Sequence, residues 1–258
     1  MQIIDLSITI EAGLPSDPEP MVPAIDYTDH IQGAEQMATF FPGLRREQLP
    51  DGLGWALETL HLTTHSGTHL DAPFHYHPTM DGGAASLTID QIPLHWCFQD
   101  GVRLDFSTKA DGERITAADV QAKLDQIGYG LKPLDIVLVR TGADRFWGKP
   151  EYLLKGAGMT RESTLYLLER GIKVVGTDAW SWDRPLPYLA QEFRQTGDPS
   201  VVWEAHFAGI EKGFCHMEKM ACLDRIPRPY GFKVACFPIK IKSASAGWTR
   251  PVAIVEDP

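Results

Sequence analysis

The segment His65–His77 constrains this chain more than any other, because it combines metal-binding side chains with two residues that interrupt regular structure. Within thirteen residues it holds four histidines and one aspartate, separated by Gly67 and Pro73. Glycine and proline at these places exclude an uninterrupted helix or a central strand. The sequence therefore predicts a loop that folds back and directs several polar side chains to one place.

Imidazole and carboxylate groups are the ligands that zinc, manganese and iron(II) accept from proteins. A histidine-rich loop can also be a polar turn, and a single histidine is more often a hydrogen-bonded core residue than a ligand. Here His65, His69 and Asp71 are spaced so that their side chains can converge, which favours a divalent metal site. A structural or solvent-facing role is expected for the histidines outside this pattern: His30, His61, His77, His95 and His216.

The same residues carry a resemblance to a known family. The pattern His-x-Gly-Thr-His-x-Asp-x-Pro-x-His is typical of the cyclase-like metal-dependent hydrolases, which include bacterial kynurenine formamidase and isatin hydrolase. This chain matches each fixed position: His65, Gly67, Thr68, His69, Asp71, Pro73 and His75. Farther along, His206 and Glu218 stand twelve residues apart, as the second ligand pair of the family does. The stretches 176–178 and 245–250 also resemble the longer members.

The resemblance implies one or two divalent ions per chain, zinc or manganese. The first ion would be held by His65, His69 and Asp71, and a second ion, bridged by Asp71, would be held by His206 and Glu218. Some relatives hold a single ion. His75 would lie beside the ions as the catalytic residue that transfers protons. The resemblance also implies a homo-oligomer, a dimer or a tetramer, in which an aromatic residue of a neighbouring subunit could complete the pocket.

A bound divalent ion lowers the pKa of its water to about 7 and can stabilise the oxyanion formed from a carbonyl group. A histidine can take a proton from that water and return it to a leaving nitrogen or oxygen. These parts favour an enzyme that hydrolyses the amide C–N bond of a cyclic amide or an aryl formamide. Two alternatives stay open: a lactone hydrolase on the same site, and a non-catalytic metal-binding protein with a closed site. A structural zinc is a third, with looser spacing, at Cys215, His216, Cys222 and His206.

Aromatic residues in the segments that make this chain longer than a compact formamidase suggest the walls of a substrate pocket. They are Phe40, Phe41, Trp55, Trp180, Trp182 and Trp203. Flat apolar walls suit an aromatic or cyclic carbonyl compound. For each tryptophan, packing in the core is an equally good interpretation. Kynurenine formamidases have a tryptophan where this chain has Leu14, so a different substrate is expected.

Size and charge exclude several classes of protein. With 258 residues, 43% of them hydrophobic and 22% charged, the chain suits one soluble domain spanning residues 1–258. A formal net charge of −10 argues against nucleic acid or an anionic membrane as partner. No signal peptide or run of roughly 18 apolar residues is visible, so a cytoplasmic location is expected. The four cysteines are expected to be reduced and mostly buried.

Local patterns predict a mixed α/β order. Helices are expected at residues 116–127 and 160–170, where Thr116 and Thr160 can cap the first turn. Strands at 135–141 and 172–177 around the second helix indicate an α/β unit with parallel pairing. Further strands are expected at residues 3–10, 55–64, 233–241 and 251–255. The resemblance implies the swivelling β/β/α fold of the cyclase family, with which this pattern is compatible.

Overall fold

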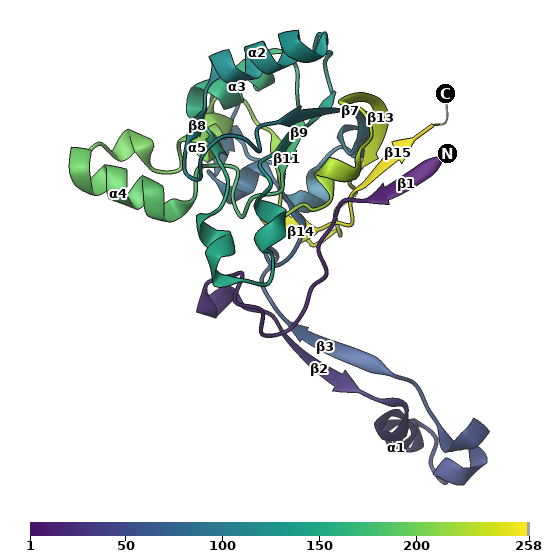
Figure 1. Ribbon diagram of the computed structural model, residues 1–258. Helices are drawn as coiled ribbons and strands as arrows, with labels where there is room; N and C mark the ends of the chain where they lie inside the picture. The colour runs from purple at the N-terminus through teal and green to yellow at the C-terminus, as the bar shows by residue number, and fades with distance from the viewer. Residues whose placement is uncertain (257–258) are drawn as a thin grey trace.

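The computed structural model describes residues 1–256, and a nine-stranded mixed sheet forms its centre (Figure 1). Its strands lie in the order β1 (Gln2–Asp5), β15 (Val252–Val255), β13 (Tyr230–Ala235), β7 (Phe98–Asp105), β9 (Ile136–Arg140), β11 (Val174–Thr177), β12 (Cys215–Glu218), β4 (His69–Asp71) and β14 (Ala246–Trp248). Strands β7, β9, β11 and β12 run parallel, and the strands on either side of them pair antiparallel. The predicted mixed α/β class is confirmed.

The central parallel strand β9 is buried on both faces of the sheet. In β9, Ile136 and Leu138 belong to one apolar cluster, whereas Val137 and Val139 belong to a second cluster. Neighbouring residues of a strand point to opposite faces, so both faces of β9 are covered. A strand covered on both faces needs apolar residues at every position, which explains the continuous apolar run in this part of the sequence.

Helices α2 (Ala117–Ile127) and α3 (Arg161–Glu169) contribute their buried residues to the second cluster. Both begin as predicted, because Thr116 and Thr160 accept a backbone hydrogen bond from the first turn. Gly128 ends α2 in the left-handed conformation, with φ of 66°, which glycine adopts without steric cost. The two predicted helices are therefore confirmed to within a residue at each end.

Three predicted strands are much shorter in the structure than the sequence suggested. The strand expected at 3–10 ends at Asp5, beyond which Ser7 forms only an isolated bridge to Met220. The strand expected at 55–64 covers only Leu57–His61. The strand expected at 233–241 is β13, which ends at Ala235. Pro238 lies in the missing part, and proline cannot donate a hydrogen bond to a neighbouring strand.

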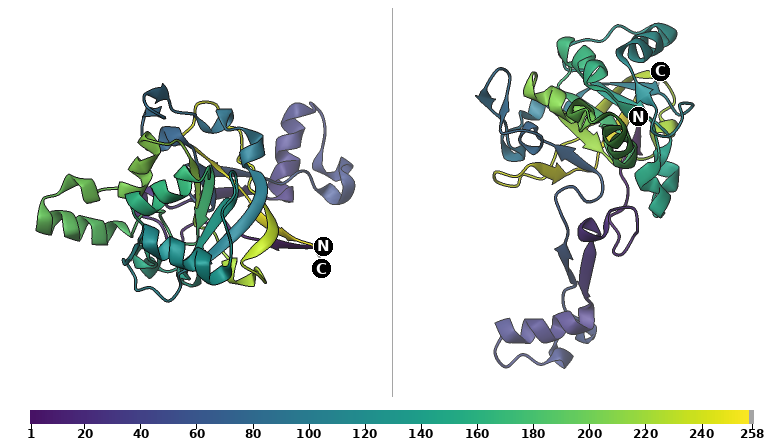
Figure 2. Two further views of the ribbon diagram at one scale, coloured as in Figure 1. Left: turned by 90° about the horizontal axis from the view of Figure 1, so that it is seen from above. Right: turned by 90° about the vertical axis from the view of Figure 1, so that its left-hand side faces the viewer.

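A long arm, residues 24–61, extends away from the sheet (Figures 1 and 2). It consists of β2 (Ala24–Thr28) paired antiparallel with β3 (Leu57–His61), and of α1 (His30–Phe40) at its far end. All five residues of β3 are exposed. Helix α4 (Leu186–Thr196) projects from another side of the molecule, and the short helix α5 (Glu204–Phe207) follows it in the chain (Figure 1).

Shorter elements connect these parts. The short strands are β5 (Thr79–Met80), β6 (Ala84–Ala85), β8 (Arg114–Ile115) and β10 (Gly158–Met159). The 3-10 helices are η1 (Glu19–Met21), η2 (Arg46–Gln48), η3 (Pro50–Gly52), η4 (Pro73–His75), η5 (Ile89–Gln91), η6 (Leu94–Trp96), η7 (Ala143–Phe146), η8 (Pro150–Leu154), η9 (Pro199–Val201), η10 (Ala208–Ile210) and η11 (Leu223–Arg225). Within residues 1–256, no helix has the length and apolar character needed to cross a lipid bilayer. All four cysteines are free thiols, and three of them are buried.

Candidate metal centre

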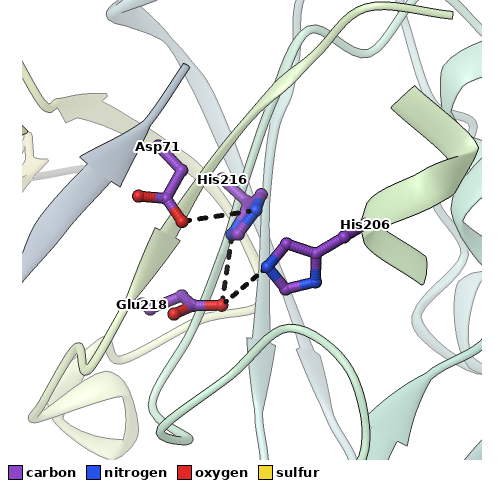
Figure 3. A group of neighbouring side chains, drawn as sticks. All are labelled: Asp71, His206, His216 and Glu218. Atoms are coloured by element: carbon purple, nitrogen blue, oxygen red, sulfur yellow. Dashed lines mark ion pairs between the residues drawn. The ribbon is translucent and has the colours of Figure 1, made fainter. Parts of the chain in front are cut away.

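Two neighbouring antiparallel strands, β4 and β12, place four potential ligands on one face of the sheet. Asp71 lies opposite His216, and His69 lies opposite Glu218. Residues two apart on a strand point to the same face, so these side chains form a square of imidazoles and carboxylates. Figure 3 shows three of them converging with a histidine from outside the sheet. Leu70, between the two ligands of β4, packs instead in the first apolar cluster.

The loop before β4 brings His65 to the same face. Gly67 has a φ of +67°, and a Cβ there would lie 2.7 Å from the Ile10 side chain, so the turn requires glycine. His65 Nδ1 lies 2.9 Å from Asp71 Oδ1, while its Nε2 lies 3.0 Å from Ser245 Oγ. The loop therefore directs Nδ1 of His65 at the carboxylate of Asp71.

Hydrogen bonds fix the next two residues of the motif. Thr68 Oγ1 donates to the backbone carbonyl of Lys219 at 2.6 Å, as expected for a residue that holds the loop. His69 Nδ1 lies 2.8 Å from the Gly67 carbonyl oxygen, which favours a proton on Nδ1 and leaves Nε2 as the ligand atom. That Nε2 lies 3.3 Å from Asp71 Oδ1. The His69 ring is thus oriented towards the shared carboxylate.

The 3-10 helix η4 follows β4 and turns His75 back towards Asp71. Pro73 begins this helix, where its missing N–H is not needed. His75 Nε2 lies 3.7 Å from Asp71 Oδ2, and the rings of His75 and His65 are 4.1 Å apart. Burial lowers the pKa of His75 to about 3, so its imidazole is neutral at neutral pH and has a lone pair available.

His206 lies on helix α5, and hydrogen bonds to the carboxylate of Asp183 fix its position. Asp183 accepts from the backbone N–H groups of Ala205 and His206, at 2.8 and 3.1 Å, and from Nδ1 of His206. Nε2 of His206 consequently faces Glu218 Oε1 at 3.5 Å. The Trp203 ring stacks on this imidazole with centroids 4.3 Å apart. A carboxylate behind the imidazole is typical of metal-binding histidines.

Several buried polar atoms of the cluster have no hydrogen-bond partner among the described residues. They are Nε2 of His69, both carboxylate oxygens of Asp71 and both ring nitrogens of His216. Such atoms cost about 1–3 kcal/mol each, and a bound cation would remove that cost. Ligand atoms lie within 4.8 Å of one another in two groups: Asp71, His206, His216 and Glu218, and His65, Asp71 and His75. The two groups share Asp71, and each brings together side chains of the kind that hold a divalent ion.

The charges of the cluster also favour a cation. Burial alone would raise the pKa of Asp71, but the neighbouring histidines, His69 and His75 foremost, hold it well below its usual range. Burial and the charge of Asp71 raise the pKa of Glu218. A divalent cation between the two carboxylates would offset their repulsion. The imidazole and carboxylate donors suit zinc, manganese and iron(II).

A cavity of 540 Å³ opens onto this cluster. At one end it is lined by His65, His75, His206 and Glu218. Its walls are mostly apolar and come from α4 and neighbouring segments: Met21, Trp180, Leu186, Leu189, Ala190, Phe193, Val202 and Trp203. The volume is that of a pocket for a small organic molecule.

Lys219 also lines the cavity, although its charge is already neutralised. Its ammonium group forms a buried ion pair with Asp17 and donates to the His65 carbonyl at 2.9 Å. Asp17 accepts a second hydrogen bond from Trp180 Nε1 at 2.8 Å. This ion pair joins the metal-binding loop to one aromatic wall of the cavity.

The structure places only some of the expected aromatic residues at the cavity. Trp180 and Trp203 line it. Trp182 is instead buried in the core, where its Nε1 donates to Thr164 Oγ1 at 3.1 Å. Its backbone N–H donates to Glu218 Oε1 at 2.8 Å. Trp182 therefore supports a ligand through its backbone and forms no pocket wall.

The other three expected pocket residues, Phe40, Phe41 and Trp55, belong to the arm and do not line the cavity of this chain. Phe40 contacts Trp55 edge to face, with centroids 5.6 Å apart. Phe40 is 70% exposed and Phe41 is 55% exposed, because the arm extends away from the body. The sequence identified these aromatic residues but held no signal for their position.

His216 lies within the ligand cluster, although the sequence suggested only a structural role for it. The signal was its position two residues before Glu218, which on a strand means the same face. Cys215 packs in the first apolar cluster on the opposite face. The groups of potential ligands found in residues 1–256 contain no cysteine, so they do not support the structural zinc alternative.

Comparisons with known proteins identify a family and a shared fold. Residues 4–184 match the model of the Cyclase family. Isatin hydrolase A from Labrenzia aggregata, bound to benzyl benzoate, is 21% identical with a TM-score of 0.76, covering 99% of this chain and 94% of that chain. An isatin hydrolase bound to the product analogue thioisatinate is 20% identical with a TM-score of 0.75, covering 99% and 93%. A protein described as a predicted metal-dependent hydrolase from Bacillus stearothermophilus is 18% identical with a TM-score of 0.59, covering 99% and 98%. No curated protein matches the chain. These likenesses establish a shared fold.

Proposed function

The chain belongs to the cyclase family, and we propose that it is a metal-dependent hydrolase that cleaves the amide C–N bond of a cyclic amide or an aryl formamide. The observation that carries this proposal is the convergence of buried, unpartnered ligand atoms at the end of an apolar cavity. A closed, non-catalytic metal site would have no such access for a substrate.

Each residue of the motif has a role in this proposal. His65, His69 and Asp71 hold one divalent ion, zinc or manganese, and Asp71, His206 and Glu218 hold a second. When bound, the ions would supply a water molecule with a pKa of about 7 and positive charge near the substrate carbonyl. His75 lies beside the ligands, with its Nε2 3.7 Å from Asp71 Oδ2, where it would take a proton from water and return it to the leaving nitrogen. His75 is the catalytic residue of the proposal.

The walls of the cavity favour a neutral aromatic or cyclic substrate. Leu186, Leu189 and Phe193 present apolar groups from α4, and Trp180 and Trp203 add flat rings. The one lysine that lines the cavity is paired with a buried aspartate, so it is not available for a substrate carboxylate. An amino-acid substrate such as N-formylkynurenine would leave its charged groups without partners here, which favours an uncharged compound.

Hydrolysis of isatin, N-formylkynurenine and a simple lactone by the metal-loaded protein tests this proposal. We expect cleavage of the cyclic amide and little cleavage of the charged formamide. His75→Ala should slow amide cleavage more than ester cleavage, since a leaving nitrogen needs a proton more than a leaving alkoxide does. Equal losses on both substrates, or cleavage of the lactone alone, would favour the lactone hydrolase.

The proposal includes a homo-oligomer, a dimer or a tetramer, in which the arm contacts a second copy. Large apolar side chains stay exposed along the arm, among them Tyr27, Ile31, Phe40, Phe41 and Leu60. Exposed apolar patches of this kind mark interfaces between proteins. Phe40→Glu combined with Leu60→Glu should give a monomer by light scattering, whereas an unchanged mass would argue against the arm as the interface.

A further inference from the structure

We infer that His216 is a fourth protein ligand of the second metal ion, beside Asp71, His206 and Glu218. This inference rests on the metal-binding part of the proposed function. The family pattern assigns no ligand at this position, and the sequence predicted a structural role. The assignment makes the two ions unequal, because one has four protein ligands and the other has three.

The position of the ring supports this role. The His216 side chain is fully buried, with an exposed fraction of 0%. Its Nε2 lies 3.6 Å from Asp71 Oδ2, and its Nδ1 lies 3.4 Å from Glu218 Oε1. The rings of His216 and His206 meet edge to face with centroids 4.4 Å apart (Figure 3). The ring is thus surrounded by the other three ligands of the site.

The alternative is that His216 is simply an aromatic residue of the core. The ring does stack with two others: its centroid lies 5.7 Å from that of Tyr76 and 6.4 Å from that of Trp182. Stacking would be equally good for phenylalanine. A neutral imidazole also has one N–H to donate and one lone pair to share, and here neither nitrogen has a hydrogen-bond partner among the described residues. A bound cation gives the lone pair a partner, and core packing does not.

The two sites differ in the number of their protein ligands. His65, a ligand of the first ion, keeps 16% of its side chain exposed and lines the cavity beside the proposed catalytic residue His75. His206 and Glu218, ligands of the second ion, also line the cavity, but their side chains are only 1% and 9% exposed, and that of His216 is fully buried. Four protein ligands are typical of a structural zinc site, whereas three ligands and an open position are typical of a catalytic one. The ion at His65, His69 and Asp71 is therefore the one that has a position open to a water molecule.

Removal of the imidazole with retention of the stacked ring is the sharpest test. We expect wild-type protein to bind two ions per chain and to lose the ion with three protein ligands first to a mild chelator. His216→Phe should weaken the more tightly held ion at least tenfold, measured by competition with a chromophoric chelator. Trp182→Phe is the matched control, because it perturbs the same stack and keeps the backbone N–H that holds Glu218. That control should retain both affinities within a factor of two or three.

A second measurement needs no variant and decides the matter if His216→Phe does not fold. In wild-type protein with labelled histidines and an NMR-active cadmium isotope, a ring nitrogen of His216 should show a one-bond coupling to the metal. Two ions with unchanged affinity in His216→Phe, or no coupling at His216 beside clear couplings at His206, would overturn the inference alone. A wild-type protein that binds no metal would overturn the proposed function as well.

Discussion

Replacement of Asp183 by asparagine tests how the protein orients a ligand without touching the metal centre itself. The carboxylate accepts three hydrogen bonds: Oδ1 from the Ala205 N–H, and Oδ2 from the backbone N–H and Nδ1 of His206. Asparagine has the same size but only one acceptor oxygen. Whichever way its amide is turned, an NH₂ group faces a donor, and at least one of the three bonds is lost.

The expected magnitude follows from the role of such outer partners. Removal of the group behind a metal-binding histidine typically lowers metal affinity by about 10–100-fold, equivalent to about 1.4–2.7 kcal/mol. Asp183→Asn should therefore weaken the ion held by His206, while saturating metal should restore much of the activity. Affinity is measured by chelator competition, and activity by initial rates at increasing metal concentration.

Asp178→Asn is the matched control for this experiment. Asp178 is also a buried carboxylate with three hydrogen bonds, but it accepts them from Thr141 and Gly142, outside the ligand cluster. It should lower stability without changing metal affinity. Equal losses of affinity in the two variants, or no loss in Asp183→Asn, would refute the argument that Asp183 acts through His206.

Three further predictions concern catalysis, stability and pH. His75→Ala should lower kcat by about 10²–10⁴-fold with metal content unchanged, and loss of metal in this variant would make His75 a ligand instead. Lys219→Met leaves Asp17 buried without its partner and should lower the free energy of unfolding by about 3–5 kcal/mol. Asp17→Asn added to this variant should recover part of the loss, and additive losses would contradict the pairing. In the metal-free protein, His75 of the unfolded chain takes up a proton below about pH 6.5, whereas burial keeps it neutral in the folded protein down to about pH 3. The free energy of unfolding should therefore fall as the pH falls across this window, by up to about 1.4 kcal/mol per pH unit from this residue. His75→Asn should reduce that slope, as followed by chemical denaturation, and an unchanged slope would contradict the burial argument.

The elements of the central fold were predictable because their signals are local. Helix caps at Thr116 and Thr160 and the apolar run of β9 depend only on neighbours in the sequence, and the structure confirms them. The position of residues 24–61 was not predictable in this way, because they extend away from the sheet and no local pattern indicates that. No local pattern indicated that β3 pairs with β2 in an arm, so the exposed position of Phe40 and Phe41 on that arm was not predictable.

The residues of the candidate site also differ in how far the sequence alone predicts them. The motif from His65 to His75 was readable because its ligands lie close together in the sequence. His206 and Glu218 came from the resemblance, since no spacing rule connects them to a loop more than a hundred residues earlier. The role of Asp183 depends on the position of α5, which only the folded chain reveals. His216 could have been found from its position two residues before Glu218, once residues 215–218 were assigned to a strand.

The metal content of the purified protein, wild type beside His69→Ala, tests the central claim most directly. After loading with zinc or manganese and removal of free metal, elemental analysis should give two ions per wild-type chain. His69→Ala should lose the ion of the open site and the hydrolytic activity with it. A wild-type chain without bound metal, or a His69→Ala chain with the full complement and full activity, would contradict the account.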